Sequence, residues 1–197
     1  MKNKPIFPEI KNDFASYNKK RKIRVEILEQ SRDTIEVNLI NLSYNEERLQ
    51  NFKNIAINLL CFLIYMNFFS RLPFIDLCLL CILLFLICRM LKIIKKDSIC
   101  FYGGLALRTE TTYFLNQKSS FFLPTEYIFD TVINEVIENL CVKYILIIRT
   151  KKEVYHQKPI IPVITALEPS IQCLKFIYER LRNKILLYNG ISNENKI

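Results

Sequence analysis

The chain has 197 residues, a formal net charge of +9 and 51% apolar residues. This length allows one domain of ordinary size together with a membrane segment. Its seven cysteines are an odd number without a visible disulfide framework, and we expect reduced thiols in a cytosolic compartment. Because a long apolar block accompanies the basic excess, that excess indicates an anionic membrane surface rather than nucleic acid.

The first 53 residues divide into a tail and a hairpin. Residues 1–22 are rich in Lys and Asn and lack the apolar stretch of a signal peptide, so we expect a flexible basic N-terminus. In residues 23–53, apolar and polar residues alternate on both sides of a turn at residues 31–33. This alternation predicts a β-hairpin.

The apolar block, residues 54–96, is divided by Pro73. Two apolar runs, about 54–70 and 74–91, are each ~17 residues long, at the low end of what a membrane-crossing helix needs. We therefore expect a two-helix transmembrane hairpin with Pro73 at its tip. Basic residues before and after the hairpin outnumber the one at the tip, so both termini are expected to face the cytosol.

Three basic residues, Lys92, Lys95 and Lys96, follow the second run. We expect the second helix to continue through them into the membrane interface. Their side chains then either extend to the surface as charges that stop translocation or bind lipid head groups specifically. Both interpretations place the three ammonium groups at the membrane surface.

The remaining residues predict an α+β fold. Residues 97–188 alternate mostly with a period of two, which predicts several antiparallel strands, and Gly103-Gly104 marks a turn between two of them. Apolar residues at three- and four-residue spacing after Pro169 predict a closing amphipathic helix. We expect a small antiparallel-sheet domain with a C-terminal helix, similar in plan to a pleckstrin-homology-like domain, and a flexible tail at 189–197.

No arrangement of residues singles out a reactive site. The single histidine, His156, lies in a Lys-rich segment, and the sequence has no glycine-rich phosphate loop and no D-x-D or E-x7-E pattern. Cys78 and Cys81 form a C-x-x-C inside the apolar block, where two small helix residues are favoured over a redox or zinc site. We therefore expect no catalytic residue, no metal and no cofactor.

One stretch stands out within the predicted sheet. In residues 130–137 the polar pair Asn134-Glu135 interrupts an apolar run. The pair is explained equally well by a bulge or tight bend, in which Asn134 bonds nearby backbone, and by a surface that recognises another protein.

Several pieces of the chain together carry a resemblance to a known family. In chain order they are the apolar hairpin, Asp97-Ser98-Ile99, Phe122-Leu123-Pro124, residues 130–135, Ile161-Pro162-Val163, and the helix from Pro169. Residues 55–185 resemble the PIG-H family, accessory subunits of phosphatidylinositol N-acetylglucosaminyltransferase. The resemblance implies a non-catalytic component of the complex that transfers N-acetylglucosamine from UDP-N-acetylglucosamine to phosphatidylinositol, the first step of glycosylphosphatidylinositol (GPI) anchor synthesis.

The resemblance also implies partners and a location. The partners are the catalytic glycosyltransferase subunit, other membrane subunits and lipids of the endoplasmic reticulum, where the chain is expected as a multi-pass membrane protein. We expect the partner-docking motif to comprise Asp130, Val132, Ile133, Asn134 and Glu135. Two other hypotheses remain: a membrane-anchored pleckstrin-homology-like module that binds phosphoinositides, and an enzyme acting on its own.

Overall fold

A computed structural model describes residues 10–18, 20–31, 33–68, 73–138, 140–151 and 158–194. Of the helical residues 66–68, 73–76 and 186–194 only the backbone is described. The predicted hairpin tip around Arg71, the single histidine and residues 1–9 of the predicted N-terminal tail lie outside these residues.

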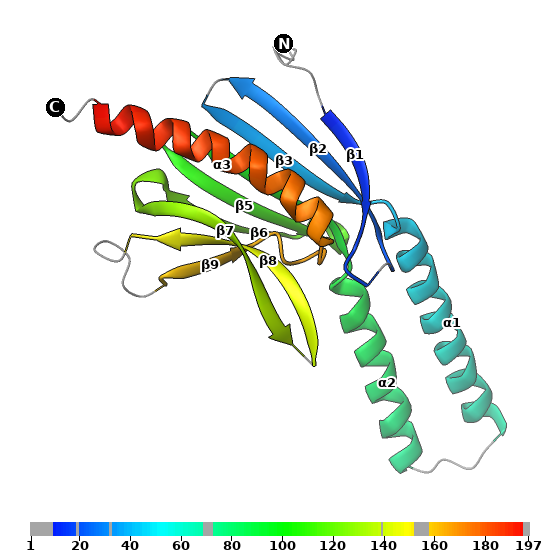
Figure 1. Ribbon diagram of the computed structural model, residues 1–197. Helices are drawn as coiled ribbons and strands as arrows, with labels where there is room; N and C mark the ends of the chain where they lie inside the picture. The colour runs from blue at the N-terminus through cyan, green and yellow to red at the C-terminus, as the bar shows by residue number, and fades with distance from the viewer. Residues whose placement is uncertain are drawn as a thin grey trace.

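The domain contains two antiparallel sheets (Figure 1). The six-stranded sheet runs in the order β1 (Ile10–Ala15), β2 (Lys22–Ser31), β3 (Thr34–Asn41), β4 (Ile94–Tyr102), β5 (Ala106–Tyr113) and β6 (Lys118–Pro124). The three-stranded sheet consists of β7 (Ile128–Glu138), β8 (Cys141–Thr150) and β9 (Ile160–Val163). Short 3₁₀ turns, η1 (Phe114–Asn116) and η2 (Thr125–Tyr127), connect β5 to β6 and β6 to β7. Within residues 1–22, for which no ordered element was predicted, β1 pairs with β2.

Two helices, α1 (Tyr44–Phe68) and α2 (Pro73–Leu91), form a hairpin that projects from one end of the domain (Figure 1). They lie in the chain between β3 and β4, which are hydrogen-bonded neighbours, from Thr34 opposite Tyr102 to Ile40 opposite Lys96. The helical hairpin is therefore an insertion between two paired strands. The strands before it and the strands after it belong to the same sheet.

The core forms where α3 (Ile171–Glu194) packs on the inner faces of both sheets (Figure 1). On β2, β3 and β4 every second side chain points inward, which explains the period of two in the sequence. Over the part of α3 whose side chains are described, the buried residues recur at three- and four-residue spacing, and they are Cys173, Leu174, Ile177, Leu181 and Ile185. The predicted α+β class, with antiparallel sheets and a closing C-terminal helix, is confirmed.

The turn from β4 to β5 is the Gly103-Gly104 turn expected from the sequence. Gly104 has φ 77°, a left-handed conformation that glycine adopts without steric cost. A Cβ on Gly103 would lie 2.6 Å from the Cβ of Asp33, in the turn between β2 and β3. The glycine pair thus lets two neighbouring turns approach closely.

The prediction of a transmembrane hairpin is wrong. Within the described residues, no helix has a stretch both long enough and apolar enough to span a bilayer. The apolar part of α1 starts only at Ile55, because the helix begins with the charged residues of its first turns. In α2 the uncharged stretch between Asp76 and Arg89 covers only residues 77–88. Stretches of roughly 10–14 apolar residues are shorter than the ~20 needed to span the hydrocarbon core.

The same finding corrects the predicted location. A multi-pass protein of the endoplasmic reticulum membrane, with both termini cytosolic, needs spanning helices, and the described residues contain none. The expected extension of the second helix through Lys95 and Lys96 is also absent, since α2 ends at Leu91 and both lysines belong to β4.

Candidate interaction surfaces

The β7–β8 ribbon carries the predicted docking motif. β9 pairs only with residues 146–149 of β8, and no described strand pairs with residues 141–145 on that side. The outer half of the ribbon is therefore two-stranded, and it projects from the domain in Figure 1. Two-stranded ribbons are of marginal stability by themselves and leave backbone groups open to a partner.

The motif does not form one surface. Asn134 lies opposite Ile145, and Glu135 lies opposite Tyr144. Because neighbouring residues of a strand point to opposite faces, the exposed side chains of Asn134 and Glu135 lie on different sides of the ribbon. The Glu135 face continues from Ile133, which packs against the core, whereas the Asn134 face also carries Val132. The register shift of this strand pair lies between Ile128 and Asp130, so Asn134 is not in a bulge.

Asp130 holds the base of the ribbon. The Nε of Arg149, on β8, donates to Oδ1 of Asp130 at 2.6 Å, and Nη2 donates to Oδ2. The guanidinium of Arg149 also lies over the Phe129 ring, 5.5 Å from its centroid. The bond to the Asp130 carboxylate raises the pKa of Arg149 above its usual value. Asp130 thus orders the backbone of the motif by a cross-strand ion pair.

The apolar tip of the ribbon was not predicted from the sequence. Leu140 is fully exposed, at 100%, and Ile137 is 78% exposed. Val142 and Cys141 are exposed beside them. Residues 136–142 mix apolar and polar side chains, and the sequence alone does not mark the apolar ones as uncovered. Only the end of β9 at Val163 shows that nothing within the described chain covers them.

The helical hairpin is the second apolar surface. α1 and α2 pack along each other, and yet large apolar side chains are exposed on both, including Ile57, Leu60, Leu77 and Phe85. On α1 the adjacent residues Leu59 and Leu60 are both exposed, and neighbours on a helix point about 100° apart. The exposed apolar surface is therefore wider than one stripe. Cys78 and Cys81 are also exposed on α2.

The three lysines predicted at a membrane surface do not form one cluster. Lys92 is exposed just beyond α2. Lys95 donates a hydrogen bond to Oδ1 of Asn116 at 3.2 Å, and the Nζ of Lys96 lies 4.0 Å from a carboxylate oxygen of Glu36. The predicted membrane-surface role of the three remains a prediction.

Asp97 is a buried carboxylate, only 2% exposed. Its Oδ1 accepts a hydrogen bond from the Thr111 hydroxyl at 3.0 Å, whereas its Oδ2 has no hydrogen-bond partner among the described residues. The backbone N–H groups of Ser98 and Ala166 also face the carboxylate and lower its pKa. Burial raises its pKa to about 6, although the hydrogen bonds act in the opposite direction. Ala166 belongs to the loop between β9 and α3, so Asp97 joins the large sheet to the segment that leads into the closing helix.

The described part of the chain offers no metal site. No group of three or more His, Cys, Asp or Glu side chains in it could hold an ion. Several of its carboxylates, most of them half-buried, make ion pairs, and Asp13 pairs with Arg24 across two strands at 2.8 Å.

Comparison with known families gives a match to a segment that includes the β7–β8 ribbon. Residues 98–163 match the family model described as the PIG-H component of the GPI-GlcNAc transferase complex. The match covers about a third of the chain. The PIG-H segment runs from β4 through β9 and so includes the whole ribbon with the predicted motif. The matched model describes a component of the GPI-GlcNAc transferase complex, and the resemblance expected from the sequence is confirmed over this range.

The PIG-H segment is smaller than the folded unit. It excludes β1–β3, the helical hairpin and α3, although β3 pairs with β4 and α3 covers the core. No curated protein and no solved structure gives a significant match to the chain. The pleckstrin-homology-like plan therefore has no structural counterpart in these comparisons.

Proposed function

We propose that this chain is the non-catalytic subunit that tethers and stabilises the catalytic glycosyltransferase subunit of the GPI-GlcNAc transferase. In this role it serves the transfer of N-acetylglucosamine from UDP-N-acetylglucosamine to phosphatidylinositol. The observation that carries the proposal is the coincidence of the PIG-H match with an uncovered ribbon. A component of a complex needs a surface for its partner, and the ribbon's exposed apolar tip is of the kind that partners cover.

The β7–β8 ribbon is the first docking element in this proposal. Ile137 and Leu140 supply apolar anchors at the tip, while Asn134 and Glu135 supply polar contacts on the two faces. A partner that lies along the ribbon can also pair with the free edge of β8 at residues 141–145. Apolar anchors surrounded by polar contacts are the usual anatomy of a protein interface.

Substitution in the ribbon tests this assignment. The double variant Ile137→Ser/Leu140→Ser is expected to lower co-purification of the catalytic subunit at least tenfold, since buried apolar anchors dominate interface energies. Asn134→Ala/Glu135→Ala is expected to lower it less. The matched control is Leu105→Ser/Ile160→Ser, which changes two similarly exposed apolar residues elsewhere. If both ribbon variants, at normal expression, recover as much catalytic subunit as the wild type does, the ribbon is not part of the interface.

The helical hairpin is the second docking element, and its occupant is apolar helices of other subunits of the complex. Small side chains on α2, at Cys78 and Cys81, allow a neighbouring helix to approach closely. Cys78→Phe/Cys81→Phe is expected to weaken assembly. The control is Leu80→Phe on the same helix, which is expected to leave assembly unchanged because Leu80 is already a large residue. Assembly unchanged in the double variant would restrict docking to the ribbon.

The non-catalytic assignment has its own test. The family description names a component of the complex, and no nucleotide-sugar motif occurs in the sequence. The purified chain alone is expected to show no turnover of UDP-N-acetylglucosamine, and adding it to the catalytic subunit is expected to raise the yield of active complex. Turnover by the isolated chain would make it an enzyme.

A further inference from the structure

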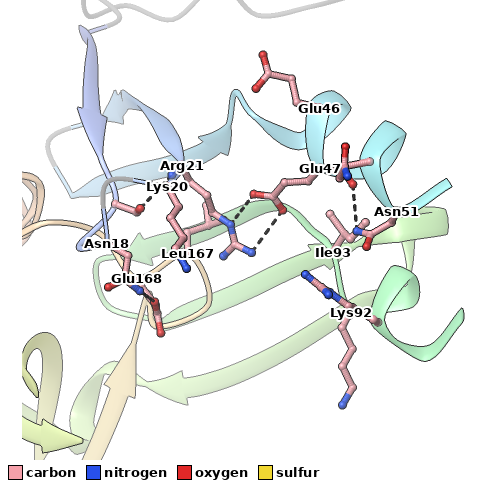
Figure 2. Close-up of a pocket in the computed structure, with 13 residues that line it drawn as sticks. Asn18, Lys20, Arg21, Glu46, Glu47, Asn51, Lys92, Ile93, Leu167 and Glu168 are labelled. Atoms are coloured by element: carbon pink, nitrogen blue, oxygen red, sulfur yellow. Dashed lines mark hydrogen bonds and ion pairs between the residues drawn. The ribbon is translucent and has the colours of Figure 1, made fainter. Parts of the chain in front are cut away.

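A polar cleft of about 640 Å³ lies where the helical hairpin meets the sheet. Its walls come from the turn between β1 and β2, the first turns of α1, the end of α2 and the loop before α3 (Figure 2). Four segments that are distant in sequence therefore meet here. Neither docking element of the proposed function includes this cleft.

Two of the three carboxylates in the cleft are already engaged. The Nε of Arg21 donates to Oε1 of Glu47 at 2.6 Å, and Nη2 lies 3.4 Å from Oε2. Glu168 accepts from the Nζ of Lys143 at 2.9 Å and from the Nδ2 of Asn18 at 3.3 Å. The third, Glu46, is exposed on the first turn of α1. Arg21, and Lys143, which Glu168 shares with Glu138, thus offset part of the negative charge that faces the cleft.

The cations of the cleft are less engaged. Lys20, Arg89 and Lys92 are exposed, and none makes an ion pair or side-chain hydrogen bond with a described residue. Glu47 binds Arg21 through Nε and Nη2, so the remaining edge of the guanidinium, with Nη1, is open. Figure 2 shows the Arg21 guanidinium in the middle of the cleft and Lys20 close to it, with Lys92 extending away at the rim.

We propose that this cleft binds a phosphate group. The orientation of Arg21 is fixed by Glu47, so its open edge is preorganised to donate two hydrogen bonds to one anion. Lys20 supplies a second positive charge, and Arg89 and Lys92 can swing in on long flexible side chains. A phosphate, with several oxygens and up to two charges, can accept from all of them at once, whereas a carboxylate has only two oxygens. The inference stands independently of the proposed function.

A phospholipid head group and a nucleotide offer the same phosphate chemistry, and titration distinguishes them. Full-length protein in mild detergent is titrated with inorganic phosphate, glycerophosphoinositol and uridine diphosphate, with sodium chloride at matched ionic strength as the reference. A ligand that binds the folded state raises the melting temperature with its concentration. Phosphate is expected to bind with a millimolar dissociation constant, and the tighter of the two organic probes identifies the source.

A charge-matched pair of variants shows where the anion binds. Lys20→Ala/Lys92→Ala is expected to raise the dissociation constant at least tenfold, and Arg89→Ala severalfold. The control, Lys53→Ala/Lys175→Ala, removes the same two charges from exposed positions on α1 and α3 and is expected to stay within twofold of wild type. A rise in melting temperature no larger than with chloride, or equal affinities for the two double variants, would overturn the proposal.

Discussion

The large sheet and the helical hairpin use similar apolar residues in opposite ways. Phe101 on β4 is 0% exposed, whereas Phe85 on α2, in the element just before it in the chain, is 66% exposed. Around Phe101, two sheets and α3 enclose the side chain. Around Phe85, only the facing helix is available, and it covers one side. An apolar side chain therefore stabilises this chain only where a second layer covers it, and elsewhere it is available to a partner.

The strongest test of this contrast is to truncate both phenylalanines. Phe101→Ala is expected to lower the free energy of unfolding by roughly 3–5 kcal/mol, since it opens a cavity in the core. Phe85→Ala is expected to change it by less than about 0.5 kcal/mol, because the side chain is mostly exposed already. Urea unfolding of the isolated chain measures both. A large loss with Phe85→Ala would mean that the hairpin belongs to the core.

The buried carboxylate of Asp97 is expected to make the stability of the core depend on pH. Its pKa is about 6 in the folded chain against an ordinary value of 3.8, so the unfolded chain loses this proton at a lower pH. Stability is therefore expected to fall as pH rises from about 4 to 6 and to be level above that. The loss is up to roughly 3 kcal/mol, from about 1.4 kcal/mol per pKa unit. Asp97→Asn should abolish this slope in urea unfolding.

An exposed carboxylate provides the control for that experiment. The Arg24 guanidinium hydrogen-bonds to Asp13 and lowers the pKa of that carboxyl. Its contribution to stability is thus present above the ordinary pKa and is lost as pH falls, opposite in sign to Asp97. Asp13→Asn should leave the slope between pH 4 and 6 in place. An unchanged slope in Asp97→Asn would assign the effect to another group.

Removing the helical hairpin is also expected to change stability little. Because β3 and β4 pair directly, a short Gly-containing turn between Asn41 and Ile94 should replace residues 42–93 without unfolding the sheet. The melting temperature is expected to change by only a few degrees, since loop length affects closure entropy weakly. Circular dichroism and thermal unfolding report the result. Loss of the folded state would show that the hairpin supports the sheet.

The sequence predicts those features of this structure that depend on residues close together in the chain, and it misses those that depend on contacts between distant segments. The alternation from Ile23 and the spacing from Leu174 identified β2 and α3, since each pattern lies within one element. The stretch 130–135 pointed to the PIG-H family and to the ribbon. The apolar tip at Leu140 was missed, because exposure there depends on where β9 ends, and no local pattern records that.

The sequence by itself determined the α+β class, the order of the elements after the hairpin and the family resemblance. Only the tertiary structure decided that β3 and β4 are neighbours across the hairpin, that Asp97 is buried, and that Asn134 and Glu135 face opposite ways. It also overturned the transmembrane hairpin, because no helix within the described residues has a stretch both long enough and apolar enough to span a bilayer. Periodicity reports what one element does locally, whereas burial and pairing depend on contacts between distant segments.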